Sequence, residues 1–287
     1  MSSRLLLSCL LAVAAAGPVV AQTPPPPAQG QAAPGQPAQG GTLPGVTVKG
    51  SRDPNVEKSY RAMVRGMNLF EQKKPRVAPG AQLRFRVLPR KPGVSLDDLE
   101  MYIFGERAQI PVDLAPDKSF VLPRSEQAFR ENAIVTPDRR ALTMTWRADV
   151  RTPGLPPDTR RLGDLRLECQ VGMESGLVSN SPSWITRLYD ALDNTPAYCE
   201  RRENKYLFFA DRPVFGVTLV AGNRREVLPT NRLWAGALDD PHLREELQFC
   251  DCERLVDRTY YVPLGDPGWP DDTLVLFDFM EESNAAR

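Results

Sequence analysis

The feature that most constrains the fold of this chain is a strict alternation of apolar and polar residues that recurs along it. Leu83, Phe85 and Val87 fall on one side of such a run, with Arg84 and Arg86 on the other. Further runs with the same period contain Leu99, Met101 and Ile103; Leu142, Met144 and Trp146; Leu165, Leu167, Cys169 and Val171; and Phe215, Val217 and Leu219. A period of two is typical of half-buried strands, so these runs predict antiparallel sheets.

Turn and cap signals place the other elements. Ala221-Gly222-Asn223 predicts a hairpin turn after the Phe215 run, and Thr273 to Phe279 predicts a final strand. Asp53-Pro54 supplies a helix start, and a helical stripe follows it. The stripe consists of Val56, Tyr60, Met63, Met67 and Phe70. Two more helices are expected near 183–193, capped by Ser183, and near 241–249, after Asp240-Pro241.

The chain is therefore predicted to be mainly β with a few short helices, a β-rich α+β fold. One or two antiparallel β-sandwich modules are expected behind a disordered N-terminal tether. The expected order is a signal peptide at 1–21, a disordered linker at 22–45, a short strand and helix at 46–78, a first module at 79–172 and a second at 173–287.

The N-terminal region is predicted to be an export signal followed by a linker. Arg4 precedes the apolar run Leu5 to Ala16, which is too short to span a bilayer, and Val19-Val20-Ala21 suits signal peptidase cleavage before Gln22. From Gln22 to Gly45 the residues are Pro, Gly, Gln, Ala, Thr and Leu, with too little apolar side chain to offset the entropy of ordering. We expect export to the periplasm, or secretion, and no transmembrane helix in the mature chain.

The cysteines of the exported chain are expected to form structural disulfides, because export places them where such bonds persist. Four cysteines allow three pairings. The favoured pairing joins Cys169 and Cys199 each to one of Cys250 and Cys252, since a bond within C-x-C would close a small, strained ring. The alternative joins Cys169 to Cys199 around the helix at Ser183 and leaves Cys250 and Cys252 to each other or free.

Three functional uses of the thiols remain as alternatives. A redox role needs a low-pKa thiolate, which the neighbouring Asp251 and Glu253 disfavour. A zinc site of four cysteines would depart from the usual C-x-x-C spacing, and nucleophilic catalysis would need the single histidine, His242, as a base. We expect no metal and no cofactor.

Composition excludes several function classes. The 36 basic residues balance 36 acidic ones, which argues against a nucleic-acid partner. One histidine rules out metal sites that need two, and the sequence has no GxSxG, Walker or GxGxxG motif, so no catalytic residue is assigned. Arginine doublets such as Arg160-Arg161 and Arg224-Arg225 suit the phosphates of anionic envelope polymers, although charged strand edges explain them as well.

One loop combines rigid turns with acids and an aromatic ring. Asp266, Trp269, Asp271 and Asp272 lie in the stretch 263–272. Such residues would suit a calcium loop, a sugar-binding edge or the carboxylate pair of a glycoside hydrolase. A tight loop between two strands, with Trp269 as a cap on the core, would use the same residues.

The sequence thus favours an exported, non-enzymatic binding, interaction or structural module of the bacterial cell envelope. Its partner would be another envelope protein or an anionic envelope polymer. The alternative is a carboxylate-dependent hydrolase that acts on carbohydrate or peptidoglycan near Asp266, Asp271 and Asp272.

Overall fold

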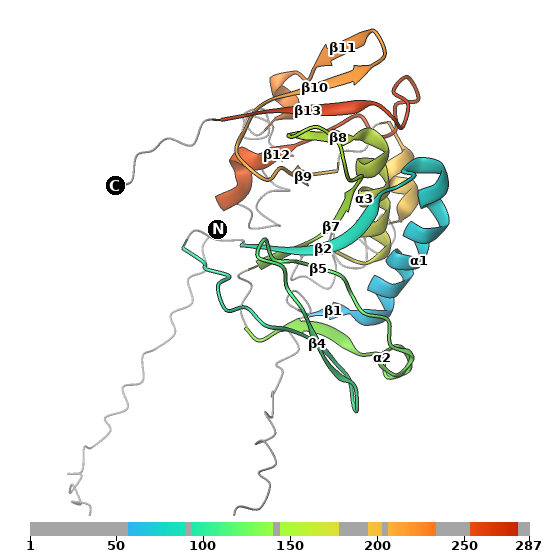
Figure 1. Ribbon diagram of the computed structural model, residues 1–287, viewed down its shortest axis with the longest axis vertical. Helices are drawn as coiled ribbons and strands as arrows, with labels where there is room; N and C mark the ends of the chain where they lie inside the picture. Colours follow the sequence, from blue (N-terminus) through green and yellow to red (C-terminus); the bar gives the residue numbers. More distant parts are fainter. Residues whose placement is uncertain are drawn as a thin grey trace, which may run out of the picture. The chain divides into compact units, whose positions relative to one another are not determined.

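The computed structural model describes residues 57–89, 93–139, 144–177, 195–202, 206–233 and 253–280 (Figure 1). The predicted signal peptide, the linker, the helices near 183–193 and 241–249, Cys250, Cys252 and His242 lie outside these residues. The described residues form mostly antiparallel β-sheets with three α-helices, which confirms the predicted fold class. Of the described helices, none is both long and apolar enough to cross a membrane.

Four antiparallel sheets are described. The first has the order β1-β6-β3-β4, formed by β1 (Lys58–Ser59), β6 (Ile134–Pro137), β3 (Met101–Phe104) and β4 (Gln109–Val112). The second has the order β11-β10-β13-β8, formed by β11 (Arg224–Val227), β10 (Val214–Ala221), β13 (Leu274–Phe279) and β8 (Thr159–Arg161). The third has the order β5-β2-β7, formed by β5 (Ser119–Phe120), β2 (Gln82–Pro89) and β7 (Met144–Arg151), and β12 (Thr259–Tyr260) pairs with β9 (Phe208–Phe209) in the fourth.

The helices connect these sheets. The α-helices are α1 (Tyr60–Val77), α2 (Glu126–Arg130) and α3 (Leu162–Glu174), and three short 3₁₀ helices are η1 (Pro196–Glu200), η2 (Thr230–Arg232) and η3 (Glu253–Arg258). In Figure 1, α1 and α3 lie next to each other beside the β2 and β7 strands. Gly66 makes this approach close, because a Cβ there would collide with the Ser175 hydroxyl at the end of α3.

The predicted strand faces are confirmed on β2 and β7. Phe85 and Val87 are buried, and Ala148 and Trp146 lie opposite them in the antiparallel register and are buried too. The intervening residues, among them Arg86, place charged side chains on the other face of this sheet, since side chains alternate along a strand. The β10–β11 hairpin around Gly222 and the final strand β13 are also confirmed.

The predicted start of the first helix is wrong in one respect, because residues 58–59 are a strand. The described part of its apolar stripe is right, whereas Asp53, Pro54 and Val56 lie outside the described residues. Tyr60, Met63 and Phe70 are buried, but α1 begins only at Tyr60 because β1 precedes it. Ser59 caps the helix, and its hydroxyl accepts a hydrogen bond from the Ala62 amide.

The predicted strand through Leu165, Leu167, Cys169 and Val171 is wrong, because these residues belong to helix α3. Two apolar stripes with helical spacing lie on different sides of this helix. Leu167 and Val171 pack into one hydrophobic core with β2 and β7, and Leu165 and Cys169 pack into a second core with β10 and β13. The stripes are offset by two residues, so together they imitate the alternation of a strand.

Two hydrophobic cores thus meet at α3, which spans the predicted module boundary at residue 172. The division into two modules stays a prediction. One face assignment on β10 is wrong: Phe215 is 70% exposed, whereas Val214, Val217 and Leu219 are buried. The register of β10 against β13 shifts between Val214 and Gly216, and this irregularity turns Phe215 outward.

Candidate functional site

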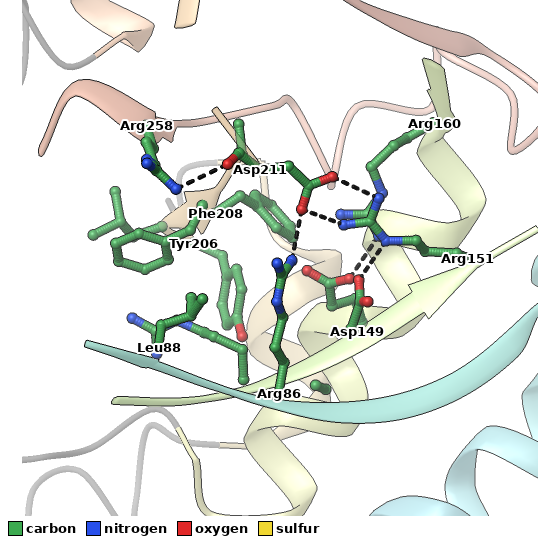
Figure 2. Close-up of a pocket in the computed structure, with 15 residues that line it drawn as sticks. Arg86, Leu88, Asp149, Arg151, Arg160, Tyr206, Phe208, Asp211 and Arg258 are labelled. Atoms are coloured by element: carbon green, nitrogen blue, oxygen red, sulfur yellow. Dashed lines mark hydrogen bonds and ion pairs between the residues drawn. The ribbon is translucent and has the colours of Figure 1, made fainter. Parts of the chain in front are cut away.

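The candidate site lies on the charged face of the β5-β2-β7 sheet. The segment Tyr206–Asp211, which contains β9, passes over this face and encloses a pocket with β2 and β7 (Figure 2). Arg86 of β2 and Arg147 of β7 are cross-strand partners. Arg151 lies four residues after Arg147 on β7, and side chains an even number of residues apart point to the same face of a sheet, so all three share one face. We call this site the arginine pocket.

Asp211 is the centre of the arginine pocket, and Figure 2 shows it between Arg86 and Arg151. Arg151 donates from both terminal nitrogens, Nη1 to Oδ2 and Nη2 to Oδ1, at 2.9 Å each. Arg86 Nη1 donates to Oδ1 at 2.6 Å, and Arg258 Nη1 donates to the Asp211 main-chain carbonyl at 2.8 Å. Burial pushes the pKa of Asp211 upward, but the hydrogen bonds and charges of Arg151 and Arg86 outweigh it and lower the pKa to about 2.

A buried ion pair forms the floor of the pocket. Arg160 of β8 donates from Nη2 to Glu168 Oε2 of α3 at 2.6 Å, and the two side chains are only 8% and 9% exposed. The same groups bind the edge of β7 that does not pair with β2: the Val150 amide donates to Glu168 at 3.0 Å, and Arg160 donates to the Val150 carbonyl at 2.6 Å. Burial raises the pKa of Glu168 although Arg160 opposes this effect.

Aromatic rings form the remaining wall. Tyr206 contacts Phe208 at a ring-centroid distance of 4.8 Å, and Phe208 stacks on Tyr260 at 5.4 Å. The guanidinium of Arg147 lies 4.3 Å from the centre of the Phe209 ring, a cation–π arrangement. Burial raises the pKa of Tyr206 to about 12, so its hydroxyl stays neutral.

The described residues enclose two cavities at the pocket, of about 30 and about 70 Å³, and both are lined by Arg151, Arg160 and Asp211. A water molecule needs roughly 10 to 15 Å³ measured in this way, so the larger cavity has room for a small polar group. Tyr260 and Arg160 line it, and the Tyr260 hydroxyl and Arg160 Nε have no hydrogen-bond partner among the described residues. Buried polar atoms rarely lack a partner, so a polar occupant of this cavity is favoured.

The lining of the first cavity is electropositive. It contains five arginines against three carboxylates, an excess of two positive charges. The arginines are Arg86, Arg147, Arg151, Arg160 and Arg258, and the carboxylates are Asp149, Glu168 and Asp211. Sequence reasoning missed this site, except that Arg160 belongs to one of the doublets that suggested anion binding. The other signal is the charged side of the β2 alternation, which by itself indicates only the polar side of a half-buried strand.

The loop at 263–272 lies elsewhere, between β12 and β13, and its side chains hold the loop together. Asp266 accepts from the Gly268 amide at 3.0 Å and from Arg202 at 2.9 Å. The Gly268 amide and then the arginine charges lower the pKa of Asp266. Trp269 is buried, whereas Asp272 is exposed.

Arg166 of α3 fastens this loop to the body. Its guanidinium donates to the carbonyls of Leu264, Asp266 and Trp269 and, at 2.6 Å, to the carboxylate of Asp271. The Arg224 guanidinium lies 3.6 Å from the centre of the Trp269 ring. A binding role for Asp266, Trp269, Asp271 and Asp272 stays a prediction, but two of the carboxylates already have partners within the chain.

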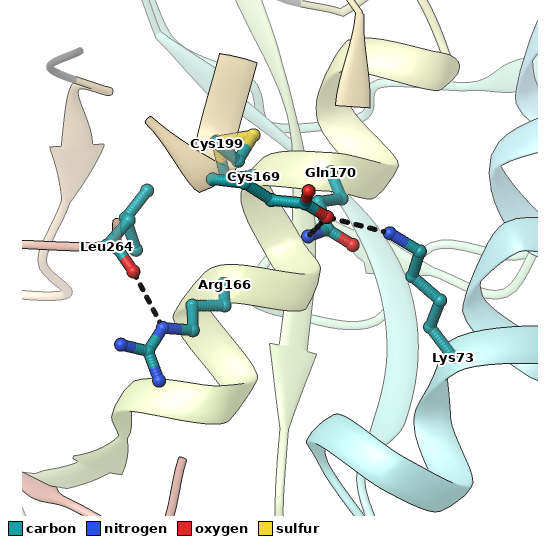
Figure 3. The surroundings of a disulfide bond; sticks show 7 residues. Lys73, Arg166, Cys169, Gln170, Cys199 and Leu264 are labelled. Atoms are coloured by element: carbon teal, nitrogen blue, oxygen red, sulfur yellow. Dashed lines mark hydrogen bonds and ion pairs between the residues drawn. A yellow bond between two sulfur atoms is a disulfide. The ribbon is translucent and has the colours of Figure 1, made fainter. Parts of the chain in front are cut away.

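The favoured cysteine pairing is wrong, and the Cys169–Cys199 bond of the alternative is confirmed, whereas Cys250 and Cys252 lie outside the described residues. Cys169 of α3 is bonded to Cys199 of η1, with a Cα–Cα distance of 6.0 Å, and both residues are buried (Figure 3). Beside the bond, Glu200 of η1 accepts from Lys73 of α1 at 3.1 Å and from Gln170 of α3 at 3.2 Å. The disulfide is therefore part of a tie between η1 and the α1–α3 pair.

Within the described residues, no cluster of three or more His, Cys, Asp or Glu side chains is arranged to hold a metal ion. No family model, curated protein or solved structure matches this chain. The site therefore has to be interpreted from its own chemistry. The fold and the arginine pocket define a disulfide-bonded, mostly antiparallel β protein with an electropositive pocket on one sheet face.

Proposed function

We propose that the chain is an exported, non-enzymatic binding module of the bacterial cell envelope, and that its arginine pocket binds an anionic group of the partner. The excess of arginine over carboxylate in the pocket lining carries this proposal. A guanidinium binds carboxylate and phosphate through two parallel hydrogen bonds and stays charged when it is partly buried. An anionic envelope polymer is the partner class that best suits such a lining.

The location rests on two observations of different weight. The Cys169–Cys199 disulfide is consistent with an extracytoplasmic location, because reducing conditions in the cytosol disfavour such bonds. The finer assignment to the periplasm rests on the signal-peptide pattern at 1–21.

A carboxylate-dependent hydrolase at Asp266, Asp271 and Asp272 is the weaker alternative. Such an enzyme needs two carboxylates that are available to substrate and to water. Arg202 already binds Asp266, and Arg166 already binds Asp271.

Titration calorimetry with anionic oligomers tests the proposal. The probes are a soluble oligogalacturonate, an inorganic polyphosphate and, as a neutral reference, a maltodextrin of matched length. The wild-type chain should bind at least one anionic probe and not the neutral one. Arg151→Gln should weaken this binding at least about ten-fold, the usual effect of losing charged hydrogen bonds.

Arg124→Gln is the matched control, because Arg124 is an exposed arginine that donates to Asn68 outside the pocket. It removes the same charge and should change the dissociation constant less than about two-fold. Equal losses in the two variants would show non-specific attraction and would contradict the proposal, as would equal binding of the neutral probe. Circular dichroism in the near ultraviolet confirms that each variant is folded.

A further inference from the structure

The arginine pocket already holds a carboxylate, that of Asp211. Arg151 faces it with two parallel N–H···O contacts of 2.9 Å, and Arg86 adds a third contact of 2.6 Å. This is the arrangement in which a guanidinium recognises a carboxylate ligand. The carboxylate comes from the covering segment Tyr206–Asp211, not from the strands that supply the two arginines.

The arginines are held in place independently of Asp211. Arg151 Nε donates to Asp149 Oδ1 at 2.8 Å, so its two terminal nitrogens keep their direction when their acceptor leaves. The main chain of the covering segment also has its own ties, from Arg258 to the Asp211 carbonyl and from the Ala210 amide to the Arg258 carbonyl. The Asp211 side chain is 42% exposed, so it reaches water by a rotation of its own bonds.

We propose that the ligand presents a carboxylate group and that this group replaces the Asp211 side chain on Arg151 and Arg86. Asp211 is then a built-in competitor that occupies the site until the ligand arrives. The inference rests on the proposed function and specifies its ligand class. A uronic acid of an anionic envelope polymer presents such a carboxylate.

The contacts of Asp211 favour a carboxylate over a phosphate. Arg151 and Arg86 already hold a carboxylate in the pocket, so a ligand carboxylate can take the same place on the same donors. A planar group with two oxygens also matches the two parallel donors of one guanidinium.

Rescue of a truncated side chain by a small ion tests this inference. Asp211→Ala removes the built-in carboxylate and leaves its place on the two arginines empty. The melting temperature of this variant is measured with increasing sodium acetate at constant ionic strength. Acetate should bind the vacated site and raise the melting temperature of Asp211→Ala by about 3 °C at saturating concentrations, because a ligand of the folded state stabilises that state.

Three comparisons make the result specific. Wild type and Glu226→Ala should gain less than about 1 °C, and Glu226 is a matched control because its exposed carboxylate accepts from Arg224 outside the pocket. Inorganic phosphate should raise the Asp211→Ala melting temperature less than acetate does. Asp211→Ala with Arg151→Gln should lose the acetate effect.

Two kinds of result would overturn the inference. Equal acetate effects in Asp211→Ala and Glu226→Ala would show that the site does not take a free carboxylate, and a larger effect of phosphate would refute the ligand class. If Asp211→Ala does not fold in buffer, a cooperative transition that appears with acetate supports the inference, and its absence overturns it. Arg151-dependent binding of an anionic oligomer to wild type would still uphold the proposed function in these cases.

Discussion

The buried ion pair between Arg160 and Glu168 should dominate the stability of this site. Glu168→Gln keeps the size of the side chain and an oxygen that accepts from the Val150 amide, but it removes the negative charge. The same oxygen accepts from Arg160 Nη2, so a hydrogen bond can remain, but the buried guanidinium would lose the negative charge that neutralises it. Leaving one member of a buried pair without its partner costs about 3 to 5 kcal/mol.

Urea denaturation followed by circular dichroism measures this cost. With a slope of about 3 kcal/mol per molar urea for a chain of this size, a loss of 3 kcal/mol lowers the midpoint by about 1 M. The double variant Arg160→Met with Glu168→Gln should lose less than the sum of the single variants, by about 2 kcal/mol, because it leaves no buried charge.

Glu174→Gln is the control on the same helix. Glu174 accepts from Arg65 at 2.9 Å, but both side chains are partly exposed, so this variant should lose less than about 1 kcal/mol. Similar midpoints for Glu168→Gln and Glu174→Gln, or additive losses in the double variant, would refute the reasoning.

Three further predictions concern the carboxylate site, the disulfide and the loop. Between pH 4 and 2 the free energy of unfolding of wild type should fall by about 1 kcal/mol more than that of Asp211→Asn. Folding lowers the pKa of Asp211, so as the pH falls the unfolded state takes up this proton before the folded state does. Acid titration of the two proteins measures the difference. Replacing Cys169 and Cys199 by alanine should cost about 3 to 4 kcal/mol, since the bond closes a loop with a sequence separation of 30, and wild type with reductant should show the same urea midpoint. Arg166→Lys should cost about 2 to 4 kcal/mol by urea denaturation, because an ammonium cannot reproduce four contacts of a planar guanidinium, whereas an unchanged midpoint would mean that the loop holds itself.

The sequence predicts the strands of this fold better than its helices. On β2 the buried face is decided by one core, so the alternation of Phe85 and Val87 with arginine identifies it. On α3 two cores act at once, and stripes at Leu165 and Cys169 and at Leu167 and Val171 combine into a false alternation. The sequence also lacks a helix-start signal at α3, because its N-cap residue is Arg161, whose side chain makes no capping hydrogen bond.

The site was beyond sequence reasoning for a different reason. The contact between Asp211 and Arg151 joins residues 60 positions apart, and nothing local in either segment marks the pairing. The pairing of Cys169 with Cys199 is of the same kind: the strain of a bond within C-x-C favours other pairings on sequence grounds, whereas the packing of helix α3 places Cys169 against η1. Long-range pairing of this kind depends on the packing of the sheets, which periodicity does not report.

The most direct test of the central claim is to locate where an anion binds on the full chain. Hydrogen–deuterium exchange of wild type with and without oligogalacturonate measures this for every backbone amide. The account predicts changes at Tyr206–Asp211 and at the neighbouring parts of β2 and β7, and none at the loop 263–272. Changes confined to that loop, around Asp266 and Asp271, would contradict it and would return the binding site to the segment that the sequence suggested.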